Sequence, residues 1–206
     1  MTICERYRLE RRLGSGGQAS VWRCHDLVTG REVAVKVVDF EEDPRKARRA
    51  TREIQTLQSL TDPHTVRILD TGRDDDDHYV YIVMPVISGE SLSDRLRRGG
   101  MGVADVISII QGVSSSLSEA HSLGICHRDV KPSNIMIHAS GAAVLLDFGI
   151  ASSLDQSSSL TATGTVIGTL PYMAPEVVRG EKATPAADVY SLGAVMYECV
   201  SERPPF

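Results

Sequence analysis

The sequence has little of what would place it in several large classes of protein. Four cysteines are present, but they form no Cys-x-x-Cys pair and no cluster with histidine at zinc-binding spacing, so we expect reduced thiols. No apolar run reaches the roughly 18 residues of a membrane-spanning helix, and Met1 opens no signal peptide. These absences predict a soluble, cytoplasmic chain.

The sequence also has fewer basic than acidic residues. Lys and Arg number 22 against 27 Asp and Glu, a formal net charge of −5, whereas a dedicated nucleic-acid binder would carry a basic surface. We therefore expect no nucleic-acid partner. With 206 residues, the chain can bury a sizeable core as one domain or as two small lobes, and it contains no internal repeat.

The most informative stretch is residues 127–149, which begins with the sequence HRDVKPSN and ends with DFG. Two acidic residues and an amide in a short, loop-rich window suit a site for phosphate and a divalent metal, because Mg²⁺ prefers oxygen ligands and takes few of them from protein. Asn134 and Asp147 can supply such oxygens, which leaves Asp129 to take a proton from a hydroxyl. Lys131 would place a positive charge on a transferring phosphoryl group.

In order and spacing, these two motifs resemble the catalytic loop and the metal-binding loop of protein kinases, specifically the bacterial Hanks-type serine/threonine kinases. The resemblance implies an α+β, two-lobed fold. A small lobe over 1–84 would hold an antiparallel β-sheet and one helix, a hinge would cover 85–87, and a mainly helical, incomplete large lobe would cover 88–206. It also implies transfer of the γ-phosphoryl group of ATP to Ser or Thr hydroxyls of proteins, with Mg²⁺ or Mn²⁺ as the metal ion.

Residues 7–40 read as three strands separated by turns, with the loop GSGGQA at 14–19 between the first two. Glycines there let the backbone come close to a phosphate and present N–H groups to it, although hairpin turns also use glycine. Strands on both sides of the loop argue against the dinucleotide-binding fingerprint, which needs a helix directly afterwards. Ala19 stands where the kinase pattern has its third glycine.

The strand over 33–38 carries Lys36 in an apolar run, where an unpaired ammonium group would be costly to bury. By resemblance this lysine holds the α- and β-phosphates of ATP, and Glu53 is its ion-pair partner. From Pro44 onward, apolar or small residues recur at helical spacing and predict the mobile helix of the small lobe (Ala47, Ala50, Ile54, Leu57 and Leu60). A solvated helix carboxylate is the alternative interpretation of Glu53.

Two further strands are expected over 66–69 and 79–83, and we interpret the Asp run at 74–77 as a solvated turn rather than a metal site. The residues that follow match the hinge that receives adenine, where Pro85 keeps its carbonyl and Ile87 supplies an N–H. Met84 would be the gatekeeper of the pocket and Met136 its floor. The implied ATP site comprises Leu13, Gly14, Ser15, Gly16, Gly17, Gln18, Ala19, Val21, Ala34, Lys36, Met84, Pro85, Ile87 and Met136.

Helices are predicted in the C-terminal part over 91–98, 103–122 and 184–200, the last of them apolar over most of its surface. Ser91 is a candidate N-cap of the first helix, with Asp94 in its first turn. The second helix has a scaffold role and an apolar face that should be buried (Val106, Ile109, Ile110, Val113, Leu117 and Ala120).

The resemblance also implies residues that support the site. His127 is expected to be a packed structural histidine that supports the loop and Phe148, and Asp188 caps the catalytic-loop backbone. Arg128, next to the catalytic aspartate, can pair with a phosphate on another segment, which would make activity depend on phosphorylation.

Residues 150–170 are rich in Ser and Thr and lack periodicity, and the sequence GTLPYMAPE at 168–176 resembles the end of a kinase activation segment. An inert linker is the alternative. Counted back from that anchor, Thr163 and then Thr161 are the expected autophosphorylation sites, with a second copy of the chain as the partner for reaction in trans. Thr169 is expected near the catalytic aspartate, where it would help to select a hydroxyl substrate.

Protein kinases normally continue beyond the point at which this sequence stops. Phe206 comes soon after the helix over 184–200, so we expect an exposed apolar flank on that helix and no arginine partner for Glu176. The alternative function is therefore a nucleotide-binding or scaffolding fragment with weak or no catalysis. A small-molecule phosphotransferase is disfavoured, because it has no use for a segment that docks protein substrates. Many members of the family continue into a membrane helix, so a longer parent is compatible with membrane anchoring.

Overall fold

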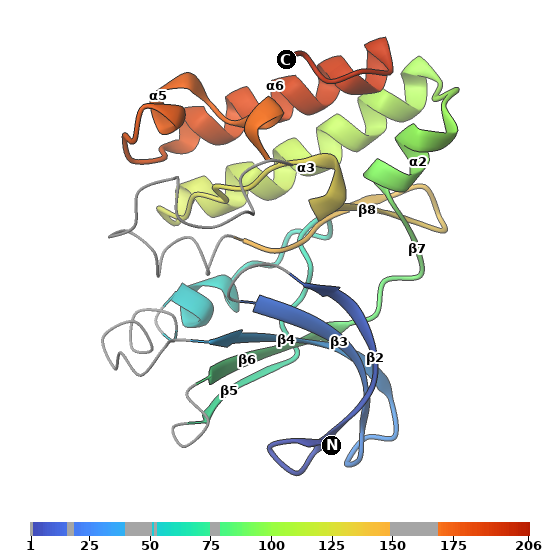
Figure 1. The fold of residues 1–206 in the computed structure, drawn as a ribbon, viewed down its shortest axis with the longest axis vertical. Coiled ribbons are helices and arrows are strands. Elements are labelled where there is room, and N and C mark those ends of the chain that lie inside the picture. The colour runs from blue at the N-terminus through green and yellow to red at the C-terminus, as the bar shows by residue number, and fades with distance from the viewer. Residues whose placement is uncertain (1, 16–18, 40–50, 52, 75–78, 149–168) are drawn as a thin grey trace. The chain divides into compact units, whose positions relative to one another are not determined.

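The computed structural model describes residues 2–15, 19–39, 51, 53–74, 79–148 and 169–206 (Figure 1). These residues form two compact units. The described residues up to Ser59, together with Arg67–Val86, make up the first unit, and Leu60–Val66 with the described residues from Ile87 onward make up the second. None of the helices in the described part of the chain is both long and apolar enough to cross a membrane.

The first unit is built on one antiparallel sheet of six strands. The three strands predicted over 7–40 are confirmed, and the third of them is buried on both faces over residues 33–36. In spatial order the strands are β1 (Thr2–Ile3), β2 (Tyr7–Ser15), β3 (Ala19–Asp26), β4 (Glu32–Asp39), β6 (Tyr79–Pro85) and β5 (Asp70–Asp74).

The strand predicted over 66–69 is wrong. That segment is irregular, and the strand begins at Asp70, which pairs with Val83. The segment 66–69 contains apolar residues typical of a strand, but its backbone groups do not pair along a single neighbouring strand. The N–H of Val66 donates to the carbonyl of Leu145 in the second unit (3.0 Å), whereas Leu69 donates to Val83 in the first (2.7 Å).

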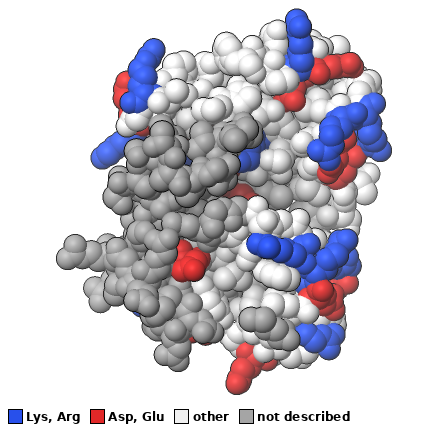
Figure 2. Space-filling model, viewed as in Figure 1, with Lys and Arg blue, Asp and Glu red and all other residues white. Residues whose placement is uncertain are grey.

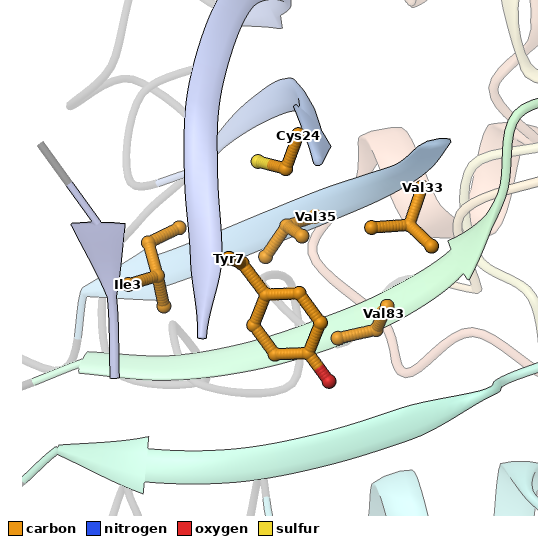
Figure 3. Packing of buried hydrophobic residues seen from close by; sticks show 6 residues of the cluster. All are labelled: Ile3, Tyr7, Cys24, Val33, Val35 and Val83. Carbon is orange, nitrogen blue, oxygen red and sulfur yellow. The ribbon is translucent and has the colours of Figure 1, made fainter. Parts of the chain in front are cut away.

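A hydrophobic cluster covers one face of the sheet (Figure 3). Residues from four neighbouring strands and the short β1 meet there because opposite residues on paired strands share a face. Cys24 is fully buried in this cluster, and burial raises the pKa of its thiol to about 11. All four cysteines are free, as expected. The cluster consists of Ile3, Tyr7, Cys24, Val33, Val35 and Val83.

A network of ion pairs joins the N-terminal hairpin to the rest of the sheet. The guanidinium of Arg6 donates to both carboxylate oxygens of Asp26 (2.9 Å each) and to Asp70 (2.8 Å). Tyr7 Oη also donates to Asp70 (2.5 Å). On the face drawn in Figure 2, the coloured acidic and basic side chains mostly lie beside one another, and exposed pairs of that kind contribute little to stability. The Arg6 network differs because Asp26 is buried.

The second unit contains a helical layer and a small sheet. Figure 1 shows α3 and α6 side by side, and the two helices contact each other along their length. The sheet is antiparallel in the order β7-β8-β9. Its elements are β7 (Gly89–Ser91), α2 (Leu92–Arg98), α3 (Val103–Ser122), η1 (Pro132–Asn134), β8 (Ile135–His138), β9 (Ala143–Leu145), η3 (Leu170–Tyr172), α5 (Pro175–Val178) and α6 (Pro185–Ser201).

All three predicted helices are confirmed, with small shifts at their ends. Ser91 caps α2 by accepting a hydrogen bond from the N–H of Asp94 (3.0 Å). The predicted apolar face of α3 is buried except for Ile110, which is half-buried. On α6, Val189 and Val200 are 61% and 63% exposed, so one apolar flank of this helix faces solvent as expected.

Candidate active site

The catalytic loop is shaped by a proline at the start of a short 3₁₀ turn. Pro132 occupies the first position of η1, where its missing N–H costs no hydrogen bond and its ring favours the helical φ angle. The N–H of Asn134 then donates to the carbonyl of Lys131 (3.0 Å), which closes the turn. This turn brings the side chain of Asn134 back toward Asp129, five residues earlier in the chain.

Three polar side chains meet at the carboxylate of Asp129. Lys131 Nζ lies 2.8 Å from Oδ2, and Asn134 Nδ2 donates to the same oxygen at 2.9 Å. Thr169 Oγ1 lies 3.5 Å from Oδ1 and accepts a hydrogen bond from Lys131 Nζ at 3.0 Å. The Asp129 side chain is 31% exposed. The carboxylate is thus oriented by a cation and an amide, and it remains open to a proton donor from solution.

His127 has no free nitrogen with which to act as a base. Its Nε2 lies 2.7 Å from the carbonyl oxygen of Leu146, which can only accept, so Nε2 carries the proton. Its Nδ1 accepts the N–H of Asp129 (3.2 Å). Burial lowers the pKa of the imidazole, which favours this neutral form, and the ring packs on Phe148 with centroids 4.7 Å apart. His127 is therefore a packed, neutral histidine between Leu146, Phe148 and the backbone of Asp129.

Asp188 holds the catalytic loop from α6. Its side chain is 1% exposed, and its carboxylate accepts the backbone N–H groups of His127 (2.7 Å) and Arg128 (2.8 Å). The φ angle of Arg128 is +68°, a strained value for a residue with a Cβ, and these two bonds help to fix it. Asp188 thus accepts two backbone N–H groups of the loop at 127–128.

A third donor to Asp188 was not predicted. His121 Nε2, near the end of α3, lies 2.8 Å from Asp188 Oδ2. The two residues are 67 positions apart, so no local spacing points to the pair. The one available signal was chemical, because a buried carboxylate needs several donors and histidine is among the few side chains that can supply one.

Asn134 and Asp147 are brought together through the backbone. The N–H of Leu146 donates to the carbonyl of Asn134 (2.8 Å), which places Asp147 one residue from that contact. Asn134 Nδ2 donates to Asp129, both to its carbonyl (2.8 Å) and to its carboxylate, so the amide oxygen is left to accept or to ligate. Asp147 has a φ angle of +53°, the kind of strain found at functional sites.

The donor set fits a divalent metal that is shared with a phosphate substrate. Within the described ranges, no three His, Cys, Asp or Glu side chains gather into a metal site of their own. One carboxylate and one amide oxygen are a usual protein contribution to Mg²⁺, which keeps waters and phosphate oxygens as its other ligands.

In the first unit, four of the predicted ATP-binding residues share one face of the sheet, opposite to the hydrophobic cluster. Val21 pairs with Lys36 across β3 and β4, and Ala34 pairs with Met84 across β4 and β6. Lys36 is only 8% exposed. Glu53 lies in a helical turn over 53–57 and is half-buried, and the predicted apolar stripe is buried at Ile54, Leu57 and Leu60. The Lys36–Glu53 ion pair stays a prediction.

The remaining predicted residues are placed as follows. Leu13, Gly14 and Ser15 end β2, Ala19 begins β3, and Pro85 ends β6. In the second unit, Met136 lies on β8 opposite Ser91, and Ile87 precedes β7. Glu176 is in the first turn of α5, and no hydrogen bond or ion pair of its carboxylate is found among the residues that the structure describes. Gly16, Gly17, Gln18, Thr161, Thr163 and Asp75–Asp77 lie outside the described residues, as do Ala47 and Ala50.

The segment after Thr169 is tied to α6 by another pair that was not predicted. Tyr172 Oη donates to Glu198 Oε2 at 2.6 Å, and burial of the ring together with this bond raises the pKa of Tyr172. A hollow within the second unit lies beside it, lined by Arg128, Asp129, Thr169, Tyr172 and Asp188 among others. The catalytic loop, the turn η3 and α6 therefore form one connected site.

Comparison with known families identifies the class of protein. The model of the protein kinase domain matches residues 7–206, and the chain belongs to this family. Its α+β architecture, with one antiparallel sheet unit and one helical unit, is that of a protein kinase. Members of the family use ATP and a divalent metal ion.

Individual relatives are similar along almost the whole chain. A probable serine/threonine-protein kinase of Corynebacterium efficiens, CE0033, is 43% identical over 99% of this chain and 32% of its own length. The serine/threonine-protein kinase PknA of Mycobacterium tuberculosis is 40% identical over 100% of this chain and 49% of its own length. The probable kinase PknB of Corynebacterium glutamicum is 40% identical over 99% of this chain. The chain thus spans about a third to a half of the length of these relatives.

Proposed function

We propose that this chain carries the catalytic machinery of an ATP-dependent serine/threonine protein kinase of the bacterial Hanks type. The observation that carries the proposal is the cluster at Asp129, in which Lys131, Asn134 and Thr169 surround a partly exposed carboxylate. The names of the relatives, all of them serine/threonine-protein kinases, support the same activity.

In this reaction the substrate hydroxyl oxygen forms a bond to the γ-phosphorus of ATP, and the bond from that phosphorus to the β-phosphate bridging oxygen breaks to give ADP. Asp129 orients the hydroxyl and accepts its proton. Lys131, 2.8 Å from Asp129, offsets the negative charge that builds up on the phosphoryl group. Thr169, through its bond to Lys131, holds the docking segment against this site.

Mg²⁺ or Mn²⁺, held by the amide oxygen of Asn134 and the carboxylate of Asp147, would neutralise charge on the phosphates. Asn134 also donates to Asp129, so the same side chain fixes the base and offers a metal ligand. We assign the binding of the α- and β-phosphates to Lys36, supported by Glu53 and by the loop at 14–19.

Regulation is part of the proposal. Thr163 and Thr161 are the proposed autophosphorylation sites, modified in trans within a dimer, and Arg128 is the proposed receiver of the phosphate. The proposed location is the cytoplasm, or the cytoplasmic side of a membrane in a longer parent protein.

Residues 1–206 incubated with Mg-ATP and dephosphorylated casein provide the test, with nucleotide binding measured in parallel. Asp129→Asn should retain ADP binding and lose transfer by about a thousandfold, within the range for a general base. Asp105→Asn, which removes the same charge from the exposed first turn of α3, should leave both unchanged. Transfer that survives Asp129→Asn would refute the base assignment. Binding without transfer in the unaltered chain would favour a nucleotide-binding fragment.

A further inference from the structure

The sheet of the first unit is open along most of β2. The short strand β1 pairs only with Tyr7 and Arg8, so the outer edge of β2 from Leu9 to Ser15 has no partner strand among the residues that the structure describes. Such an edge presents backbone N–H and C=O groups to which another extended chain can pair. We call Leu9–Ser15 the open edge.

The strand that forms the open edge is basic, although the chain as a whole is acidic. β2 carries three arginines and one glutamate, whereas the net charge of the chain is −5. All three arginines, Arg8, Arg11 and Arg12, are exposed. Figure 2 shows basic side chains gathered over the region where Figure 1 places β2 and β3. A chain that pairs with this edge would therefore meet positive charge.

The arginines lie on both faces of the sheet. Arg11 is opposite Arg23 on β3, which is opposite Ala34 on β4, so Arg11 is on the face of the predicted ATP-binding residues. Arg12 is opposite Trp22 and lies on the other face, with its guanidinium 5.7 Å from the centroid of the indole ring. A strand added at the open edge would alternate its side chains between the same two faces. Two consecutive residues of that strand would thus meet one arginine each.

This arrangement of charge is unfavourable for the sheet alone. Arg11 and Arg23 are directly opposite each other, and like charges at such positions destabilise a sheet. Arg23 is compensated by an ion pair with Glu32 (2.5 Å). Neither Arg11 nor Arg12 forms an ion pair with a residue that the structure describes. Carboxylates brought to the open edge would supply the missing charge, and a guanidinium can bind a carboxylate through two parallel hydrogen bonds.

Charges and bulges also prevent a sheet edge from pairing indiscriminately. β2 has two register shifts against β3, one between Leu9 and Arg11 and one between Arg12 and Gly14. Arg11 and Arg12 lie between these shifts, where the pairing with β3 is regular. The edge therefore disfavours neutral and basic strands, while a strand of complementary charge can still pair with it.

We propose that the open edge is a docking site for an acidic, extended segment of a partner protein. The segment adds to the sheet as a further strand and places consecutive carboxylates on Arg11 and Arg12. This inference concerns the first unit alone and does not depend on phosphoryl transfer, so direct binding can test it.

Fluorescence anisotropy with the whole chain provides the test. The probe is a short fluorescein-labelled peptide in which Asp-Glu pairs alternate with Val-Thr pairs, and its matched control carries Asn-Gln pairs instead. At physiological salt, which screens long-range attraction, the acidic peptide should bind and the control should not. Arg11→Glu/Arg12→Glu should weaken binding at least about tenfold, and Arg11→Lys/Arg12→Lys should stay closer to the unaltered chain. Arg179→Glu/Arg203→Glu makes the same change of charge at two exposed arginines of the second unit and should bind normally.

Strand addition is distinguished from simple attraction of anions by two further readouts. Amide hydrogen exchange should slow within residues 9–15 when the peptide binds. N-methylation of every Val and Thr in the peptide removes backbone donors without changing its charge, and it should abolish binding. Binding that survives N-methylation, or that phosphatidylserine vesicles or a single-stranded RNA match at equal charge, would overturn the inference. It would equally be overturned if the folded chain ignored the acidic peptide, or if Arg11→Glu/Arg12→Glu abolished only self-association of the chain.

Discussion

Two aspartates, one in each unit, are almost fully buried, and each accepts hydrogen bonds from several donors. Asp26 is 3% exposed and binds Arg6, the N–H of Val28 and the hydroxyl of Thr29. Asp188 is 1% exposed and binds His121 together with two N–H groups of the catalytic loop.

The two sites differ in what their donors do. Asp26, at the end of β3, accepts from the guanidinium of Arg6 and from the turn that follows β3. Because Arg6 lies between β1 and β2, these contacts hold the β1–β2 hairpin to β3 of the same sheet. Asp188 faces backbone groups of His127 and Arg128, and one of these residues has a left-handed φ angle. The same solution to burying a carboxylate therefore stabilises the fold in one unit and shapes the catalytic loop in the other.

Among the changes that test the comparison of these two aspartates, the largest expected effect is at Asp188. Asp188→Asn leaves one acceptor oxygen where two were used, so one loop N–H loses its partner and the loop geometry relaxes. We expect a fall of about 100-fold in phosphate transfer, because displacements of this kind cost that much. The measurement is kcat at a temperature at which circular dichroism shows the variant to be folded. Full activity in the folded variant would contradict the assigned role.

Asp26→Asn should show the opposite pattern. The guanidinium of Arg6 loses the charge of its buried partner, and we expect about 2 kcal/mol less stability with kcat unchanged for the folded protein. The one tryptophan of the chain, Trp22, lies on β3, so its fluorescence during urea unfolding reports on the sheet unit. A drop in kcat under conditions where unfolding is negligible would remove the distinction between the two aspartates.

A strand or helix was predictable from the sequence where its own residues show the pattern of apolar and polar positions typical of that element. The helix over 103–122 follows from a period of 3.6 residues, because it buries a single face. The strands over 7–40 follow from short apolar segments separated by turns. The strand expected over 66–69 failed for a reason that no local pattern contains. The two ends of that segment hydrogen bond to different units, at Leu145 and at Val83.

The candidate site was predictable to the extent that it is contiguous in the chain. Asp129, Lys131 and Asn134 lie within six consecutive residues, and the structure brings their side chains together. His121 was missed because its partner, Asp188, is 67 residues away. Helix periodicity showed the apolar face of α3 and predicted only a scaffold role for this helix, so the contact of His121 with Asp188 was not expected.

The pH dependence of stability offers a sharper test of Asp26. The Arg6 guanidinium holds the pKa of this carboxyl well below its usual range, so the unfolded chain takes up a proton there at higher pH than the folded chain does. The stability due to the charge is therefore fully present above about pH 4, the usual pKa of Asp, and is lost as the pH falls further. The difference between the unaltered chain and Asp26→Asn should be constant from pH 7 to 5 and should shrink toward pH 3. A difference that grows on acidification would show that the charge is not what Arg6 stabilises.

The smallest expected effect is at Tyr7, which shares Asp70 with Arg6. Tyr7→Phe keeps the ring in the cluster of Figure 3 and removes only the hydroxyl that donates to Asp70 at 2.5 Å. We expect a loss of about 1 kcal/mol, because Asp70 still accepts from Arg6 at 2.8 Å and stays paired. Tyr197→Phe, on the exposed flank of α6, is the matched control and should cost nothing measurable. Urea unfolding gives both values, followed by Trp22 fluorescence for Tyr7→Phe and by far-UV circular dichroism for Tyr197→Phe. A loss at Tyr7 as large as that of Asp26→Asn would mean that the hydroxyl, and not the guanidinium, holds the hairpin to the sheet.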